Sequence, residues 1–285
     1  MATDETVAQR NVSRATSPSR RLLMGDLDVV VLHYCRDGSP VLVRTWVSVS
    51  AVAWLLAGCQ DAGAQPHRIS DDFHGPDGLI AAEHHPATDD SHWEVTSGSL
   101  FRLDDTGWSG QPDAGGPPPA TGSAVFRMVS VDRGLSDVDV SVRLRVDALS
   151  ETERTPARDY DGLHVWLRYE SDKMLYAVSV DRRDGQMIIK KKCEGGDDNG
   201  GTYYDLAPWV RDMPIPFGTW QQVFVSVRDQ PDGSVKINAS RDGAQMEAID
   251  DGVGCAPLRG YGGVGIRGDN AEFRLADITV DDVAQ

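Results

Sequence analysis

The sequence predicts an all-β protein, a two-sheet antiparallel β-sandwich, and two observations support this class. Many short segments alternate apolar and polar side chains with a period of two, and Gly, Asp, Asn or Pro residues separate them. No stretch shows a helical period bounded by caps. About a dozen short strands in one domain must stack as two sheets or close into a barrel.

The clearest strand is residues 163–169, where Leu163, Val165 and Leu167 share one side. Two longer stretches, 147–160 and 193–213, read as irregular loops, and the proline-rich stretch 110–122 reads as a surface loop. The other expected strands are 93–96, 99–103, 124–129, 138–146, 175–180, 186–192, 220–228, 235–240, 263–267 and 272–280.

A short apolar run, residues 46–56, follows Arg44 and ends in Leu-Ala-Gly-Cys at Cys59. The run is too short for a permanent membrane helix, which needs about 20 residues, and fits the core of an export signal. Its end resembles the bacterial lipobox, and this resemblance implies that Cys59 is lipidated and becomes the first mature residue. We therefore expect a lipoprotein signal at 43–58 and a polar tether at 59–68. The alternative is a buried apolar strand that ends in Gly-Cys by chance.

Export signals stand at the amino terminus, so residues 1–42 are a doubtful extension. They mix charges with Ser, Thr and Asp and show no clear amphipathic period. We expect translation to begin near Val43, or at least at Met24. Mass spectrometry of the native protein tests this, because peptides between Ala2 and Arg36 would contradict it.

The chain is acidic, with 28 Lys and Arg residues against 44 Asp and Glu residues. Residues 1–58 hold six basic and five acidic residues, which leaves 22 and 39 in the expected exported part, a net charge of −17. Such a field repels nucleic acid and anionic lipid surfaces. The composition therefore argues against a DNA- or RNA-binding protein.

The four cysteines separate into different roles. Cys35 precedes the signal and Cys59 is the expected lipid acceptor, which leaves Cys193 and Cys255 in the exported domain. An even pair in an oxidising compartment predicts a disulfide, and the alternative is two unpaired buried thiols. The sequence contains no CxxC motif or His/Cys cluster, so a zinc site has no support.

Short motifs follow one another along most of the remaining chain. They are DDF at 71–73, WEVTSGSL at 93–100, DGLHVWLRY at 161–169, LYAV at 175–178, GTWQ at 218–221, GVGIR at 263–267 and FRLADI at 273–278. Their order resembles the concanavalin A-like lectin/glucanase superfamily, particularly its laminin G-like and 3-keto-disaccharide hydrolase-like jelly rolls. The resemblance covers nearly all of 69–283 and implies one jelly-roll domain at 69–285. The family-16 glucanase signature Glu-x-Asp-x-x-Glu and the alginate-lyase motifs are absent.

The period of two also predicts a ligand-binding face. If Leu163, Val165 and Leu167 face the core, His164, Trp166 and Arg168 face outward. An indole flanked by His and Arg suits a sugar ring. Lys190 and Lys192 share a face and predict an acidic ligand, although lysines also protect solvated edge strands. The complete set of expected ligand-binding residues is His164, Trp166, Arg168, Tyr176, Lys190, Lys192, Tyr203, Arg267 and Glu272.

A structural calcium ion is a further expectation. The resemblance implies such an ion where first and last strands meet, and Asp71, Asp72 and Asp277 are placed to supply oxygen ligands.

Three functions remain open from sequence. The first is an exported carbohydrate-binding protein, lipid-anchored on the outer face of a bacterial cell membrane, with a polysaccharide or oligosaccharide partner. The second is a polysaccharide lyase or glycoside hydrolase that uses the same face, although the candidate strands offer no obvious pair of carboxylates. The third is a non-catalytic envelope module that interacts with a protein.

Overall fold

The structure, a computed structural model, describes residues 27–34, 40–47, 68–83, 91–113 and 122–283. The chain divides into two compact units, Met1–Ala64 and Gln65–Gln285. The described part of the first unit is an antiparallel hairpin of β1 (Leu27–Tyr34) and β2 (Pro40–Val47). The start of the expected signal segment therefore falls in β2, whereas Cys59 lies outside the described residues.

The described part of the second unit consists of strands and connecting turns, without a helix. Its strands are β3 (Arg68–Asp71), β4 (Gly78–Ala82), β5 (Trp93–Ser97), β6 (Ser99–Leu103), β7 (Thr106–Trp108), β8 (Val125–Ser130), β9 (Val138–Leu149), β10 (Gly162–Ser171), β11 (Met174–Arg182), β12 (Ile188–Asp198), β13 (Gly201–Asp205), β14 (Gln221–Asp229), β15 (Val235–Arg241), β16 (Ala244–Asp250), β17 (Gly263–Asp269) and β18 (Ala271–Asp282).

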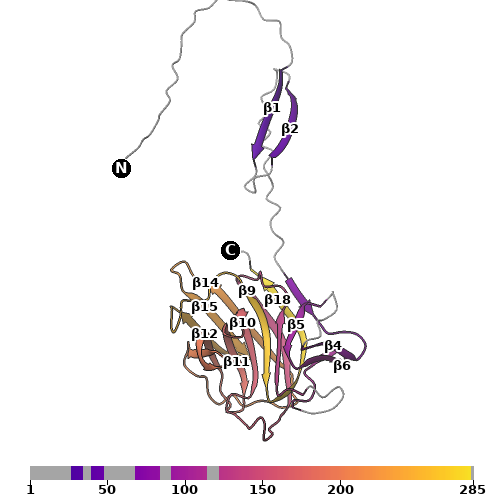
Figure 1. Cartoon of the computed structure of the whole chain (residues 1–285), viewed down its shortest axis with the longest axis vertical. Coiled ribbons are helices and arrows are strands. Elements are labelled where there is room, and N and C mark those ends of the chain that lie inside the picture. The colour runs from indigo at the N-terminus through magenta and orange to yellow at the C-terminus, as the bar shows by residue number, and fades with distance from the viewer. Residues whose placement is uncertain (1–26, 35–39, 48–67, 84–90, 114–121, 284–285) are drawn as a thin grey trace, which may run out of the picture. The chain divides into compact units, whose positions relative to one another are not determined.

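These strands form two antiparallel sheets that pack face to face (Figure 1). The seven-stranded sheet has the order β13-β12-β11-β10-β17-β8-β5, and the nine-stranded sheet has the order β16-β15-β14-β9-β18-β7-β6-β4, with β3 paired to β18. The predicted all-β, two-sheet sandwich is thus confirmed. None of the described residues belongs to a helix long and apolar enough to cross a bilayer.

The core lies between the two sheets and follows the predicted alternation. Leu163, Val165 and Leu167 of β10 are fully buried in it, and Val223 and Val225 of β14 approach from the opposite sheet. Branched side chains suit such positions because they pack well on a pleated surface. Burial of this one apolar row on each strand fixes which residues point away from the core.

The sequence pattern missed β3, β4, β7, β13 and β16. The first four have three to five residues each, too few for alternation to be visible, and β16 contains no β-branched residue before Ile249. The stretch 193–213 was wrongly expected to be irregular throughout. Its first part completes β12 and then returns as β13, which forms a hairpin with β12.

The predicted disulfide between Cys193 and Cys255 is confirmed, with Cα atoms 6.0 Å apart. It joins β12 to the turn segment that follows β16. The same segment is held by two further hydrogen bonds: Lys191 Nζ donates to the carbonyl of Cys255 at 2.6 Å, and the Leu258 amide donates to the Tyr176 hydroxyl at 2.9 Å.

Removing the disulfide should lower the stability of the domain considerably. The bond closes a loop with a sequence separation of 62 residues, for which loop entropy predicts a loss of about 4 kcal/mol in the free energy of unfolding. We expect a Cys193→Ala/Cys255→Ala double variant to unfold at a clearly lower urea concentration than the wild type.

Dithiothreitol is the matching control. It should shift the wild-type unfolding curve towards that of the double variant and leave the double variant unchanged. A wild-type curve that does not respond to reduction would contradict the stabilising role.

Candidate functional site

A cleft of about 560 Å³ lies on the face of the seven-stranded sheet that points away from the core. Six neighbouring strands, from β13 to β8, supply its floor, and the segment before β10 and the β12–β13 hairpin supply its rim. Its lining residues are Arg127, Tyr160, His164, Trp166, Ala177, Ser179, Arg182, Lys190, Lys192, Asp197, Asp198, Asn199, Tyr203, Arg267 and Asp269.

The strand register brings polar side chains from four strands into one row across the floor. Arg127 of β8 lies opposite Arg267 of β17, Arg267 lies opposite His164 of β10, and His164 lies opposite Ser179 of β11. Directly opposed residues in adjacent strands have Cβ atoms about 5 Å apart. The floor is therefore a continuous polar strip built on the rigid part of the fold.

His164 is held from both sides of its ring. Nε2 lies 3.2 Å from Asp269 Oδ2 and Nδ1 lies 2.8 Å from Ser179 Oγ. Burial lowers the pKa of His164 more than the bond to Asp269 raises it, so the neutral ring is favoured. A carboxylate can only accept, so Nε2 carries the proton and donates it, and the Ser179 hydroxyl donates to Nδ1.

Asp269 is the shared acceptor of this site. Arg267 donates to it twice, from Nε at 2.7 Å and from Nη2 at 2.8 Å. Burial alone would raise the pKa of Asp269, but the charge of Arg267 and the bond from His164 outweigh it and hold that pKa well below its usual range. Asp269 is therefore an ionised anchor that fixes two side chains of the floor.

Trp166 lies in the floor but is only 1% exposed. Its ring stacks on Tyr169 with centroids 5.5 Å apart, and it packs with Val129, Leu175 and Ala177 in a small apolar cluster on the outer face of the sheet. The expected open indole is thus a covered one, because Tyr169 packs against it. The Trp166 Nε1 atom is buried and has no hydrogen-bond partner among the described residues.

Lys190, Lys192 and Tyr203 close the side of the cleft formed by β12 and β13. Lys190 Nζ lies 3.5 Å from Asp205, and Lys192 Nζ lies 5.1 Å from the centroid of the Tyr203 ring. The Tyr203 hydroxyl accepts a hydrogen bond from Arg267 Nη1 at 3.3 Å. Residues of β13 and β17, which are not neighbours in the sheet, therefore meet in this cleft.

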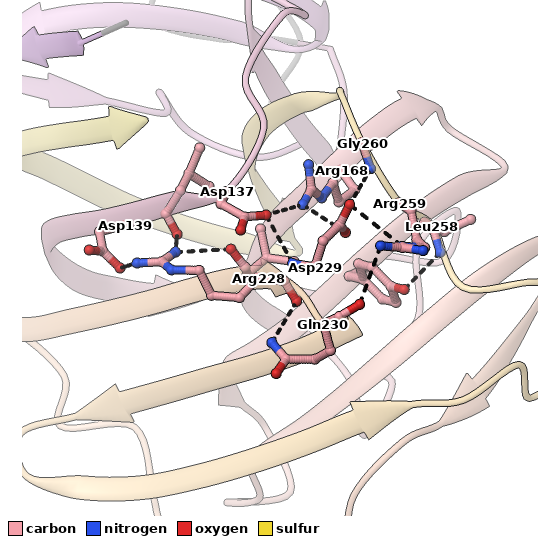
Figure 2. A network of polar contacts seen from close by, with 12 residues as sticks. Asp137, Asp139, Arg168, Arg228, Asp229, Gln230, Leu258, Arg259 and Gly260 are labelled. Carbon is pink, nitrogen blue, oxygen red and sulfur yellow. Dashed lines mark hydrogen bonds and ion pairs between the residues drawn. The ribbon is translucent and has the colours of Figure 1, made fainter. Parts of the chain in front are cut away.

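Arg168 was wrongly placed on the face of His164 and Trp166. The pairing of β10 with both neighbouring strands is interrupted around Arg168, whose φ of 49° marks an inserted bulge residue. Figure 2 shows its side chain beside two carboxylates, and Arg168 Nη2 donates to Asp137 at 2.7 Å and to Asp229 at 3.2 Å. Arg168 is a buried structural cation outside the cleft.

Tyr176 and Glu272 also lie outside the cleft. Tyr176 belongs to the core, where its hydroxyl donates to Asp250 at 2.6 Å and burial raises its pKa. Glu272 is on β18, which belongs to the other sheet, and accepts a hydrogen bond from Trp108 Nε1 at 3.1 Å. The structure thus gathers six of the nine expected ligand-binding residues: His164, Trp166, Lys190, Lys192, Tyr203 and Arg267.

The three expected calcium ligands do not converge. Asp71 accepts a hydrogen bond from Trp93 Nε1 at 3.0 Å. Asp72 accepts one from the His74 amide, and Asp277 accepts one from Arg143 Nη1 at 3.0 Å. Among the described residues there is no group of three or more His, Cys, Asp or Glu side chains arranged to hold a metal ion. Calcium binding stays an untested prediction.

Sequence reasoning missed part of the cleft. Arg127 and Ser179 alternate with core residues of β8 and β11 and could have been found from the period of two. Tyr160, 47% exposed, and the hairpin residues Asp197 and Asp198 lie in segments without periodicity, so no sequence signal places them at this face.

Comparison with solved structures supports the fold. β-Agarase B from Zobellia galactanivorans is 11% identical over 76% of this chain and 94% of its own, with a TM-score of 0.50. A β-agarase A in complex with oligoagarose is 14% identical over 77% and 93%, with a TM-score of 0.50. The carbohydrate-binding module CBM66 from Bacillus subtilis is 14% identical over 69% and 99%, with a TM-score of 0.46.

At these identities the likeness concerns the fold, which is the jelly roll of concanavalin A-like proteins, as predicted. No protein-family model matches the chain. A comparison with curated protein sequences finds no match either.

Replacing Arg168 should destabilise the fold without changing the cleft. Arg168→Met removes the buried cation that pairs with Asp137 and Asp229, which costs about 3–5 kcal/mol of unfolding free energy. Arg68→Ala is the control, because its pair with Asp281 is exposed and such pairs contribute about 1 kcal/mol or less. Urea unfolding of both variants measures the difference, and equal losses would contradict a structural role for Arg168.

Proposed function

We propose that this chain is an exported, lipid-anchored carbohydrate-binding protein that holds an oligosaccharide or polysaccharide in the cleft on its seven-stranded sheet. The observation that carries the proposal is the cleft itself. It is large enough for several sugar rings, and its lining combines aromatic rings with many hydrogen-bonding groups. Sugars need both, since their ring faces are apolar and their edges carry hydroxyls.

The accessible aromatics of the cleft are Tyr160 and Tyr203. Tyr160 is 47% exposed on the segment before β10, and Tyr203 is partly buried on β13. Between them the floor offers donors and acceptors fixed by the network around Asp269. The β-agarase A neighbour, which shares the fold, is seen with oligoagarose, and this adds support for a glycan ligand.

Binding without catalysis fits the floor better than hydrolysis. A glycoside hydrolase needs a protonated carboxyl group with a raised pKa opposite a second carboxylate. Asp269, the carboxylate in the floor, has a lowered pKa, and Arg267 occupies both of its oxygens. A lyase remains the catalytic alternative, because the floor holds a neutral His164 beside several cations.

Export is supported by the sequence of residues 43–68, in which charge, apolar core, lipobox and polar tether follow in order. The disulfide in the second unit fits an oxidising compartment outside the cytoplasm. A lipid on Cys59 would hold the domain at the outer face of the bacterial cell membrane and leave the cleft available to envelope or extracellular glycans. Neither nucleic acid nor an anionic surface suits the acidic chain.

The exposed aromatic of the cleft gives the test of carbohydrate binding. On a glycan array, the full-length protein should bind at least one glycan, and Tyr160→Ala should weaken that affinity about tenfold through lost ring stacking. Tyr261→Ala is the matched control, because Tyr261 is 70% exposed and does not line the cleft.

Incubation of each bound glycan with the protein separates the alternatives. Unchanged glycan supports a binding protein, and an unsaturated product that absorbs ultraviolet light would show a lyase. Absence of binding to any glycan would refute the proposal and favour a protein-binding envelope module.

Lipid attachment can be tested separately in a bacterial host. An alkynyl fatty acid should label the wild-type chain, and Cys59→Ser should abolish the label because the thiol is the acceptor. Cys35→Ser should keep the label, since Cys35 precedes the proposed signal. A labelled Cys59→Ser protein would contradict lipidation at this residue.

A further inference from the structure

The cations of the cleft differ in how they are neutralised. Of the five that line it, three have a carboxylate close by: Arg182 has Asp184, Lys190 has Asp205 and Arg267 has Asp269. Arg127 and Lys192 complete the five. Neither has an ion pair with any described carboxylate.

Of the two cations, Arg127 has the less compensated positive charge. It stands on β8 directly opposite Arg267, and like charges in this position repel each other. Its Nε atom is buried and has no hydrogen-bond partner in the described part of the chain. Because a guanidinium keeps its charge and can only donate, Arg127 presents an unmatched positive donor to the cleft.

Lys192 adds to the same local charge. Its Nζ donates to the carbonyl of Asp172 at 2.6 Å, which satisfies a hydrogen bond but supplies no counter-charge. Burial lowers the pKa of Lys192, and the charges of Arg267 and Arg127 lower it further, while the carboxylates of Asp172 and Asp198 offset part of this effect. The positive charges of both arginines therefore act on Lys192.

Trp166 supplies a second unmatched donor. Its buried Nε1 group has no partner, and an indole N–H can only donate. Buried polar groups in folded proteins are nearly always paired. An acceptor from outside the chain would satisfy the donors of Arg127 and Trp166, which line the cleft, although unpaired donors also occur outside it on the described residues Arg133 and Arg168. Ionised carboxylates and sulfate esters only accept hydrogen bonds, whereas a sugar hydroxyl both accepts and donates them.

The acidic residues of the rim do not remove this imbalance. Asp197 and Asp198 lie on the exposed tip of the β12–β13 hairpin, where water and salt screen their charges. Arg127, Arg267 and Lys192 lie in the floor, where screening is weaker, and the floor carboxylate Asp269 is already bound by Arg267.

We propose that the cleft binds an acidic saccharide and that Arg127, supported by Lys192, pairs with its carboxylate or sulfate group. This inference rests on the proposed carbohydrate-binding function and names the class of glycan. From sequence, Lys190 and Lys192 were expected to bind the anion, whereas the proposal assigns the main contact to Arg127. Lys190 is already paired with Asp205, and the decisive cation comes from β8.

Calorimetry with matched ligands tests the proposal on the full-length protein. One pair is a uronic-acid oligosaccharide and its carboxyl-reduced form, and the other is a sulfated oligosaccharide and its desulfated form. In at least one pair the acidic member should bind about 10- to 100-fold more tightly, the range expected for one charged hydrogen-bonded contact. The pair that shows the preference identifies the anion.

Arg127→Gln should remove most of this preference, measured as the ratio of the affinities for the acidic and the neutral member of each pair. Arg127→Lys keeps the charge and should retain part of the preference. Lys236→Gln removes the same charge from the nine-stranded sheet, where Lys236 pairs with Glu247, and should change neither affinity. Thermal unfolding of each variant checks that the fold is intact.

Three results would overturn the proposal or a part of it. If neutral glycans bind and their acidic counterparts bind no better, the acidic class is wrong while carbohydrate binding stands. If acidic glycans bind more tightly but Arg127→Gln keeps the preference, as Lys236→Gln should, the assignment of the anion contact to Arg127 is wrong. If no glycan of any kind binds, both the acidic class and the carbohydrate-binding function fail.

Discussion

The pleat of the seven-stranded sheet is the constraint on which both the core and the cleft depend. Successive side chains of a strand point to opposite faces, so each central strand supplies one row to the core and one to the cleft. On β10, Leu163 and Val165 enter the core while His164 and Trp166 reach the cleft floor. A slip of one residue would exchange the rows. The free energy gained by burying the core therefore also fixes the polar groups of the cleft.

This constraint explains what could be predicted from the sequence. Alternation alone places His164, Trp166, Lys190 and Lys192 on one side of their strands, and the structure has them in one cleft. It fails at Arg168, because the bulge there depends on how β10 pairs with β11 and β17, which lie elsewhere in the sequence.

Two other residues could not be placed from sequence for the same reason, because strand pairing joins distant parts of the chain. Glu272 follows β17 by only a short turn, yet β18 belongs to the opposite sheet, and nothing local in the sequence marks the change. Arg127 precedes Arg267 by 140 positions in the numbering, and only the register between β8 and β17 makes them neighbours. Local patterns therefore predicted the fold class and several floor residues but could not assemble the charges of the site.

The charges of the core and of the cleft follow different rules. Core cations have carboxylates close by: Arg168 has Asp137, Lys191 has Asp250 at 2.8 Å, and Arg241 has Asp181 at 2.6 Å. Such pairing is required, since an uncompensated buried charge costs several kcal/mol. In the cleft, Asp269 fixes Arg267 and His164 in place, but Arg127 has no such partner. A chain with 44 acidic residues does not lack carboxylates to place beside this arginine. The contrast is the strongest reason to seek its counter-charge in a ligand, whose binding would then require little rearrangement of a floor already ordered by the sheet.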